Sequence, residues 1–304
     1  MRIALIPFMF LAASATAQDV QPPAPPLPPE TELAFALEKT RMTVPVSVAG
    51  AGPYPFIIDT GAQRTVISRE LASELKLPRG RRVGVTAMTG RSEVDTVLVP
   101  SISVSTFSGS KIEAPALERR NMGAPGILGI DTLQGHAVAI DFDTGTMKVS
   151  PSKKRKRRSF STPGEIVIVA KSLFGQLVVT DATYRGAKIR VILDTGSEVT
   201  MGNEALRRRV ARGRRGMQDL ELVSVLGDTL VAGYTQIPQV KIGGVTFQNL
   251  PVAFSATAPF REWGLEDKPA LLLGMDALRL FRRVHIDFAN REVRLALPRG
   301  MRAV

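Results

Sequence analysis

Three copies of the tripeptide Asp-Thr-Gly mark the residues of this chain that could do acid–base chemistry. They begin at Asp59, Asp143 and Asp194, whereas average composition would place roughly 0.05 copies in a chain of 304 residues. The copies at Asp59 and Asp194 follow the apolar runs 56–58 and 191–193, which predict a buried strand that delivers a carboxylate into a tight turn. Two carboxyl groups that meet in this way cannot both ionise, so one could act as a base and the other as an acid.

The third copy, at residues 143–145, has a different setting from the other two. It follows residues 140–142 and aligns with residues 289–291, which come after the matching segment 286–288 in the second half of the chain. Asp, Asn and Gly at such places are typical of a hairpin turn. We therefore expect the third copy to be a plain turn without a chemical role.

The first two copies belong to an internal repeat, which is the main organising feature of the chain. Each is followed by a Thr-containing strand, and later by a Leu-Gly pair and an aspartate. Asp131 lies 72 positions after Asp59, and Asp276 lies 82 positions after Asp194. The additional 10 positions fall mainly in residues 257–269. We expect Asp131 and Asp276 to cap the N-termini of short helices.

Each repeat predicts the same order of elements around its Asp-Thr-Gly turn. A strand leads into the turn, a second strand and a short helix follow, and a hairpin precedes an apolar strand, another short helix and a closing hairpin. In the first half we expect these elements at 44–48, 56–58, 65–68, 69–77, 83–99, 127–133 and 138–149. In the second half we expect them at 177–180, 189–193, 199–201, from 204 onward, and at 222–232, 271–278 and 284–295. Ser68 is the expected N-cap of the helix at 69–77.

The repeated motifs resemble those of the aspartic proteases of the pepsin and retropepsin type. The resemblance rests on Asp59-Thr60-Gly61 and Asp194-Thr195-Gly196, with Leu128-Gly129 and Leu273-Gly274 downstream, and it covers nearly all of residues 40–300. It is strongest to bacterial retropepsin-like proteins, here with two tandem repeats in one chain. The resemblance implies a mainly β, bilobal acid-protease fold with two homologous β-barrel-like lobes, short helices, and an active site between the lobes.

The same resemblance implies a site to which each lobe supplies one catalytic aspartate, Asp59 from the first and Asp194 from the second. Enzymes of this type are themselves the standard example of two carboxyl groups that share one proton. One carboxylate activates a water molecule, and no metal or other cofactor is expected. The expected supporting residues are Thr60 and Thr195 as a cross-brace, Gly61 and Gly196 for close approach, and Ser197. The expected substrate-binding residues lie at the tips of two hairpins, and they are Met88, Thr89, Gly90, Leu226 and Gly227.

One position differs between the two turns. Ala62 has no hydroxyl group, whereas its counterpart Ser197 has one that could hydrogen-bond the neighbouring carboxylate and favour the charged form. We therefore hypothesise that Asp194 carries the negative charge and Asp59 the proton. Neither hairpin tip has the Tyr that pepsins place there, so closure over the substrate is expected to resemble that of retropepsins.

Composition argues against several other kinds of site. The chain has no Cys and only two His, which excludes thiolate chemistry and disfavours a His-rich metal centre. No Gly-x-Ser-x-Gly motif of a serine hydrolase is present. Most of the net charge of +12 comes from residues 153–158 and 207–215, which we expect to form a solvated linker and an exposed helix face. No nucleic-acid motif accompanies them, and the alternatives for the linker are a processing site or a contact with an anionic surface.

The first residues of the chain predict export. Residues 1–17 combine Arg2, a short apolar run and a small-x-small cleavage site, as in a secretory signal, so the mature chain would begin near Gln18. The expected location is the periplasm or the exterior of a bacterial cell, and no transmembrane helix is expected. The remaining segments are expected to be a Pro-rich linker at 18–32, a first lobe at 33–150, a basic linker at 151–163 and a second lobe at 164–304.

The function expected from these residues is that of an exported, monomeric aspartic endopeptidase acting on polypeptides. Both half-sites lie in one chain, so no dimer is required. The alternative is a catalytically silent protein that binds peptides or an envelope polymer on the same fold. The intact Asp-Thr-Gly in both halves argues against this alternative, because binding alone does not require both carboxylates.

Overall fold

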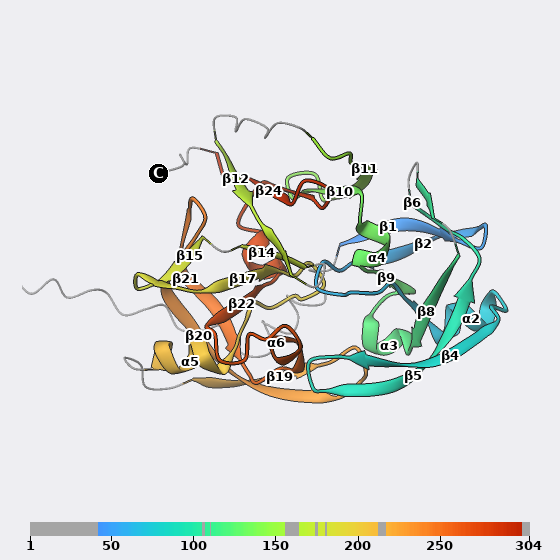
Figure 1. Cartoon of the computed structure of the whole chain (residues 1–304), viewed down its shortest axis with the longest axis horizontal. Coiled ribbons are helices and arrows are strands. Elements are labelled where there is room, and N and C mark those ends of the chain that lie inside the picture. The colour runs from blue at the N-terminus through green and yellow to red at the C-terminus, as the bar shows by residue number, and fades with distance from the viewer. Residues whose placement is uncertain are drawn as a thin grey trace, which may run out of the picture.

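Two β-rich lobes lie side by side, and a smaller third sheet lies across their junction (Figure 1). This is the mainly β, bilobal fold expected from the sequence. The structure, a computed structural model, describes residues 42–104, 107–109, 111–155, 164–173, 176–179, 181–211 and 217–299. The predicted signal sequence, the Pro-rich linker and Lys156, Arg157 and Arg158 of the basic linker lie outside these ranges. Within them, no helix is long and apolar enough to cross a membrane.

The first lobe is built on a nine-stranded sheet with the order β4-β5-β8-β3-β9-β2-β1-β6-β7. The strands are β1 (Thr43–Val48), β2 (Ala51–Ile58), β3 (Val66–Ser68), β4 (Arg79–Thr86), β5 (Arg91–Val99), β6 (Ile102–Val104), β7 (Phe107–Gly109), β8 (Ile112–Leu117) and β9 (Gly126–Leu128). The helices are α2 (Arg69–Glu74), α3 (Arg119–Met122) and α4 (Ile130–Leu133). Alternate side chains fill the core, as in β1, where Val44, Val46 and Val48 are buried.

Helix α2 begins where the sequence predicts but ends earlier. The side chain of Ser68 caps it by accepting a hydrogen bond from the backbone N of Leu71 at 3.1 Å. The helix ends at Glu74 rather than at Leu77, because Lys76 adopts a left-handed φ of 51° that an α-helix cannot continue.

The second lobe repeats the arrangement in a ten-stranded sheet with the order β13-β14-β17-β22-β18-β21-β20-β15-β16, in which β19 pairs with β20. The strands are β13 (Lys171–Leu173), β14 (Gln176–Val179), β15 (Ala182–Tyr184), β16 (Ala187–Lys188), β17 (Arg190–Leu193), β18 (Met201–Gly202), β19 (Gln218–Val223), β20 (Thr229–Ile242), β21 (Val245–Phe254) and β22 (Ala270–Leu273). The helices are α5 (Glu204–Ala211), α6 (Ala258–Glu262) and α7 (Met275–Leu278). The additional residues of this repeat include α6; Phe260 of this helix and Trp263, which follows it, are buried.

The strands that carry the two Asp-Thr-Gly turns are held in the same way in both lobes. Strand β9 lies between β2 and β3, parallel to β2 and antiparallel to β3. Strand β22 lies between β17 and β18 with the same directions. Both central strands are the apolar segments that end at a Leu-Gly pair. The repeat in the sequence therefore places the two turns at equivalent points of two equivalent sheets.

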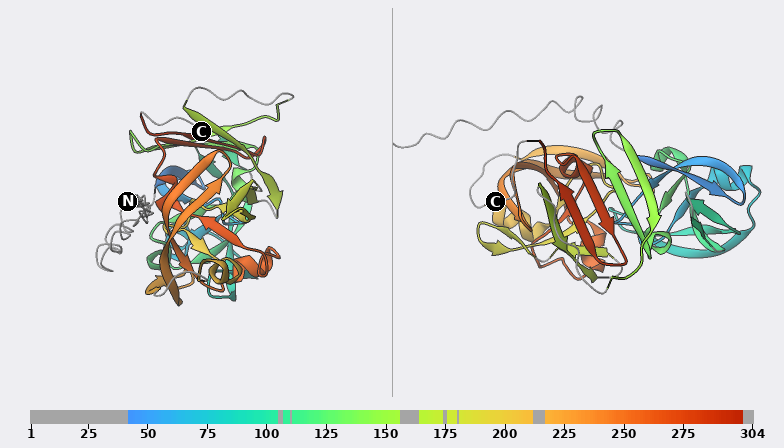
Figure 2. Two further views of the ribbon diagram at one scale, coloured as in Figure 1. Left: turned by 90° about the vertical axis from the view of Figure 1, so that its left-hand side faces the viewer. Right: turned by 90° about the horizontal axis from the view of Figure 1, so that it is seen from above.

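The closing hairpins of the two lobes pair with each other to form the third sheet. It is five-stranded with the order β11-β10-β23-β24-β12. The strands are β10 (His136–Asp141), β11 (Thr146–Pro151), β12 (Glu165–Val169), β23 (Arg283–Asp287) and β24 (Glu292–Ala296). Strands β10 and β23 are antiparallel, with Ala137 opposite Asp287 and Asp141 opposite Arg283, and Figure 2 shows the two hairpins side by side from above. The buried residues Val138 and Ile286 of this pair belong to the same core as both lobes.

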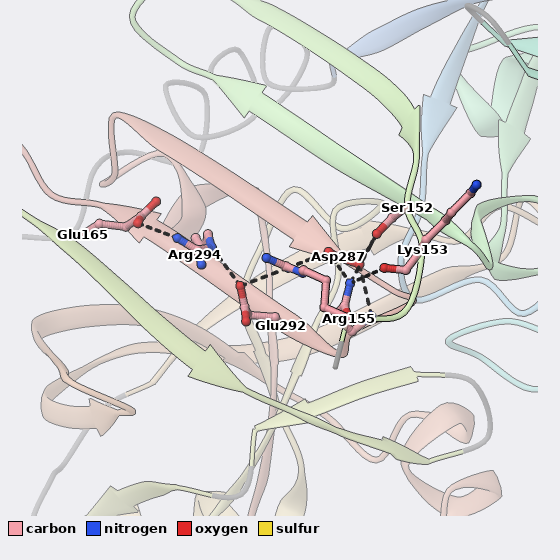
Figure 3. A network of polar contacts seen from close by, with 8 residues as sticks. Ser152, Lys153, Arg155, Glu165, Asp287, Glu292 and Arg294 are labelled. Atoms are coloured by element: carbon pink, nitrogen blue, oxygen red, sulfur yellow. Dashed lines mark hydrogen bonds and ion pairs between the residues drawn. The ribbon is translucent and has the colours of Figure 1, made fainter. Parts of the chain in front are cut away.

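A network of buried carboxylates ties the start of the basic linker to this sheet (Figure 3). Asp287 and Glu292 are only 3% and 4% exposed. Arg155 donates to Asp287 at 2.9 Å and to Glu292 at 3.4 Å, and Ser152 donates to Asp287 at 2.8 Å. Arg294 joins Glu292 to Glu165, at 2.8 Å in each case. The described start of the linker, residues 151–155, is thus held on the sheet through Arg155, although Lys153, Lys154 and Arg155 are exposed as expected.

Removing this anchor should destabilise the junction of the lobes. Arg155→Ala would leave buried Asp287 with one fewer charged partner, so we expect the free energy of unfolding to fall by about 1–3 kcal/mol at neutral pH. The effect should be below that of a fully buried pair, because the Arg155 side chain is 40% exposed. Urea unfolding measures it, with Lys154→Ala at the exposed neighbouring position as the control. Equal stabilities of the two variants would contradict the anchoring role.

The same effect should depend on pH. Burial alone would raise the pKa of Asp287, but hydrogen bonds from Asn290 and Ser152, together with the charge of Arg155, lower it below its ordinary value. A carboxyl group whose pKa is lowered by folding stabilises the fold at pH values above its ordinary pKa. This stabilisation is lost as the pH falls through the folded-state pKa. The difference between wild type and Arg155→Ala should therefore shrink in acid.

Candidate active site

The two Asp-Thr-Gly turns meet at the junction of the lobes and are cross-braced by their threonines. The Thr60 backbone N donates to Thr195 Oγ1 at 3.1 Å, and the Thr195 backbone N donates to Thr60 Oγ1 at 3.1 Å. The Thr60 hydroxyl donates to the carbonyl of Leu193 at 2.7 Å, and the Thr195 hydroxyl to that of Ile58 at 2.7 Å. Both threonines are buried, so these four hydrogen bonds fix the relative position of the turns in a place without competing water.

The glycines of the two turns allow each carboxyl group to lie against the opposite turn. A Cβ atom on Gly61 would stand 2.8 Å from Asp194 Cγ. A Cβ atom on Gly196 would stand only 2.1 Å from Asp59 Cγ. Neither distance is compatible with van der Waals contact, so Gly is required at both positions for the two carboxyl groups to approach each other.

Each carboxyl group is oriented by the backbone of its own turn. Asp59 Oδ1 accepts hydrogen bonds from the backbone N of Gly61 at 2.7 Å and of Ala62 at 2.9 Å. Asp194 Oδ1 accepts them from Gly196 at 3.0 Å and Ser197 at 3.1 Å. Because one oxygen of each group is held in this way, the geometry presets both side chains without any ligand.

The two carboxyl groups are not electrostatically equivalent. Asp194 is 8% exposed. Burial is the largest cause that raises its pKa well above the ordinary value, and the charge of Asp59 and a hydrogen bond with it add to the effect. The buried carboxyl group of Asp194 therefore favours its protonated form beside Asp59.

The contact of the Ser197 hydroxyl removes the basis of the hypothesis about the charge on Asp194. The hydroxyl of Ser197 donates to the carbonyl of Val199 at 2.8 Å, so its only proton is not available to the Asp194 carboxylate. The hypothesis that Ser197 keeps Asp194 ionised is wrong, because the hydroxyl satisfies a backbone acceptor within its own turn. Ser197 contacts Asp194 through its backbone N instead.

The aspartates of the Leu-Gly segments are also placed differently from the expectation. The N-caps of α4 and α7 are Gly129 and Gly274, not Asp131 and Asp276. Asp131 accepts hydrogen bonds from the backbone N and the hydroxyl of Thr65 at 2.8 and 2.7 Å. The equivalent aspartate of the second lobe makes the same contacts with Thr200, at 2.9 and 2.6 Å. Both aspartates thus fix the strand that follows the Asp-Thr-Gly turn.

The tips of the two predicted hairpins lie on the side of the molecule opposite the third sheet (Figure 1). The first hairpin joins β4 to β5, and Ala87 donates to Gly90 across its tip at 2.8 Å. The second joins β19 to β20. The tips touch through the hydroxyl of Thr89, which donates to Asp228 Oδ2 at 3.1 Å.

Each tip packs on the lobe to which it does not belong. Met88 packs against an apolar cluster of the second lobe that includes Trp263, and its carbonyl accepts a hydrogen bond from Ala258 at 3.1 Å. Leu226 packs against the cluster of the first lobe that includes Met122. A Cβ atom on Gly227 would stand 2.7 Å from Asn121 Nδ2. The two hairpins therefore close over the junction reciprocally.

The third Asp-Thr-Gly copy lies apart from the site, as expected. It forms the turn between β10 and β11, where Gly145 has a positive φ of 63°. Asp143 pairs with Arg282 at 2.7 Å on the surface. The prediction of a plain hairpin turn is confirmed.

One residue at the site was not found by sequence reasoning. Gln176 of the second lobe is 1% exposed and donates from Nε2 to the carbonyl of Gly61 at 2.7 Å. The turns are 135 positions apart, so the equivalent residue in the first repeat is Arg41. Because the residue types differ, the internal repeat does not single out Gln176.

The described residues contain no group of three or more His, Cys, Asp or Glu side chains that could hold a metal ion.

In the second basic cluster, Arg207 pairs with Glu204 at 3.1 Å on the surface of α5, and Arg208 is exposed. Arg212, Arg214 and Arg215 lie outside the described residues.

Comparison with known proteins agrees with this description. A family model described as aspartyl protease matches residues 44–132 and 180–277, more than half of the chain. Each matched segment contains one of the cross-braced Asp-Thr-Gly turns and the Leu-Gly segment that follows it. No curated protein matches the chain.

Proposed function

The chain belongs to the aspartyl protease family, and we propose that it is an endopeptidase that hydrolyses peptide bonds between Asp59 and Asp194. The observation that carries the proposal is the cross-braced pair of turns, in which a buried Asp194 with a raised pKa lies against Asp59. One carboxyl group is thus kept protonated beside a charged one, as acid–base catalysis requires.

The geometry supports a two-step mechanism. Asp59 takes a proton from a water molecule, whose oxygen attacks the peptide carbonyl carbon, while Asp194 gives its proton to the carbonyl oxygen. A neutral tetrahedral diol results. Asp59 then passes its proton to the amide nitrogen, Asp194 takes one from the diol, and the C–N bond breaks. Both carboxyl groups return to their starting states, and no covalent intermediate forms.

One chain supplies both halves of this site, so we propose that it acts as a monomer. The hairpin tips at Met88, Thr89, Gly90, Leu226 and Gly227 would cover a bound peptide from the side opposite the third sheet. Their reciprocal packing on the opposite lobe would hold the peptide backbone and exclude bulk water. Each hairpin tip would have to move away from an apolar cluster before a substrate could enter. We therefore expect the substrate to be a flexible, unfolded polypeptide.

Incubation of the purified chain with an unfolded protein tests this function. Mass spectrometry of the products over roughly pH 3 to 8 should reveal new peptide termini, with the rate highest on the acid side because Asp194 must keep its proton. In ¹⁸O-labelled water each new carboxylate should gain one label from solvent. Intact substrate at every pH, with the chain folded throughout, would favour the peptide-binding role instead.

We also propose that the chain is exported, on the basis of residues 1–17. Expressed in full in a bacterial host, the protein should be recovered from the periplasm or the medium with Gln18 at its N-terminus. Fractionation followed by N-terminal sequencing measures this. Recovery of the cytoplasmic protein with residues 1–17 intact would contradict it.

A further inference from the structure

A glutamine from the second lobe contacts the catalytic turn of the first. Gln176 is the first residue of β14, and its Nε2 donates to the carbonyl of Gly61 at 2.7 Å. This contact adds to the four threonine hydrogen bonds, but it lacks their symmetry. No hydrogen bond to the carbonyl of Gly196, the matching atom of the second turn, is found among the described residues.

The contact reaches Asp59 through a single peptide group. The carbonyl of Gly61 and the N–H of Ala62 belong to the same peptide, and that N–H donates to Asp59 Oδ1 at 2.9 Å. A carbonyl that accepts a hydrogen bond polarises its peptide and makes the N–H a stronger donor. Gln176 therefore strengthens a hydrogen bond to the carboxylate of Asp59.

The lengths of the hydrogen bonds follow this asymmetry. Asp59 accepts its two backbone hydrogen bonds at 2.7 and 2.9 Å. Asp194 accepts the equivalent pair at 3.0 and 3.1 Å. The carboxyl group next to the glutamine contact is held by the shorter bonds, as expected for the one that bears the charge.

Burial of the Gln176 amide lowers the stability of the fold, and a purely structural role would not explain why a polar side chain is kept here. Gln176 is 1% exposed, and its Oε1 has no hydrogen-bond partner within the described residues. A buried acceptor left unpaired destabilises a fold, and an apolar side chain of similar size would avoid the loss. The hydrogen bond that Nε2 donates to the carbonyl of Gly61 accounts for a polar residue at position 176.

We propose that Gln176 is a positioning residue that, through the Gly61–Ala62 peptide, stabilises the charge on Asp59 and so leaves the shared proton on Asp194. The inference rests on the proposed peptidase activity. In this proposal a residue of the second lobe stabilises the charged form of a carboxyl group that belongs to the first lobe.

The proposal predicts a change in pH dependence that a general loss of stability would not produce. Without the donor, the charged form of Asp59 is less favoured, so the doubly protonated pair persists to higher pH. The acid limb of kcat/KM should move upward by about half a pH unit or more. The alkaline limb should stay in place, because it reports loss of the proton from Asp194 in both proteins.

The test compares wild type, Gln176→Met, Gln176→Glu and the control Gln236→Met, a partly buried glutamine of the same lobe. Met keeps the volume and removes the donor, whereas a Glu buried at this position beside Asp59 is protonated in acid and keeps an O–H donor. Gln176→Met should shift the acid limb upward, with a fall in kcat of about 3–10-fold, and Gln176→Glu should shift it less. The control should overlay wild type.

An active Gln176→Met whose pH profile overlays that of wild type would overturn the proposal and leave the peptidase function standing. An upward shift that Gln236→Met also shows would overturn it too, because the effect would then not be specific to this contact. Wild type that is folded but inactive at every pH would overturn the function, and the inference with it.

Discussion

Asp59→Asn and Asp194→Asn are each expected to lower peptide hydrolysis by about 10³-fold or more, because each removes one partner of the acid–base pair. An amide can neither take the proton from water nor supply one to the carbonyl oxygen. Asp143→Asn is the matched control, since Asp143 begins the third Asp-Thr-Gly copy but lies in a surface turn. Initial rates on one peptide at the optimal pH give the measurement.

The stability of the same variants separates loss of chemistry from loss of fold. Because the pKa of Asp194 is raised by folding, Asp194 contributes stability at pH values below its ordinary pKa. This contribution is lost as the pH rises through the folded-state pKa. At neutral pH the wild-type protein bears this cost, whereas Asn at position 194 carries no charge to bury. Asp194→Asn should therefore have a Tm at neutral pH at least as high as that of wild type. Full activity of Asp59→Asn, or equal loss in Asp143→Asn, would refute the assignment of the pair.

Gly196→Ala is expected to lower activity by about 10²-fold, because a misplacement of about 1 Å at the reacting groups costs that much. The added Cβ would stand 2.1 Å from Asp59 Cγ, so either the carboxyl group or the whole turn must move. Gly61→Ala should have the same effect in smaller degree, because its Cβ would stand 2.8 Å from Asp194 Cγ.

The control for the glycine variants is Gly244→Ala. A Cβ atom there would lie 3.4 Å from its nearest neighbour, a side-chain atom of Ile166, so it should leave activity and Tm close to wild type. The kinetic constants and the Tm of all three variants decide the question. An active Gly196→Ala would show that the carboxyl groups do not need the close approach that the turns provide.

Much of the fold could be predicted because it depends on short-range patterns. Apolar runs that end at Asp-Thr-Gly gave strands, and turn residues between alternating strands gave hairpins whose tips lie within a few residues of the expected positions. The cap at Ser68 is also local, since its hydrogen bond joins residues three positions apart. The internal repeat then extended each assignment from one lobe to the other.

The contacts that could not be predicted depend on which of several acceptors a side chain meets in space. Ser197 was paired with the wrong acceptor because Val199 offers its carbonyl within the same turn. Asp131 was assigned to a helix end, but its partner Thr65 is 66 positions away. Gln176 lies 115 positions from Gly61 and has no counterpart of the same type in the first repeat.

The pH dependence of kcat/KM of the wild-type chain tests most directly the claim that one proton, held on Asp194, is shared by the pair. We would measure it on a single peptide over roughly pH 3 to 8, with circular dichroism at each pH to confirm the fold. The account predicts that activity falls with the loss of one proton as the pH rises above the ordinary range of an aspartate, while the protein stays folded. A rate that rises to a plateau at neutral pH and stays there up to pH 8 would contradict it, because a single ionised base would then suffice.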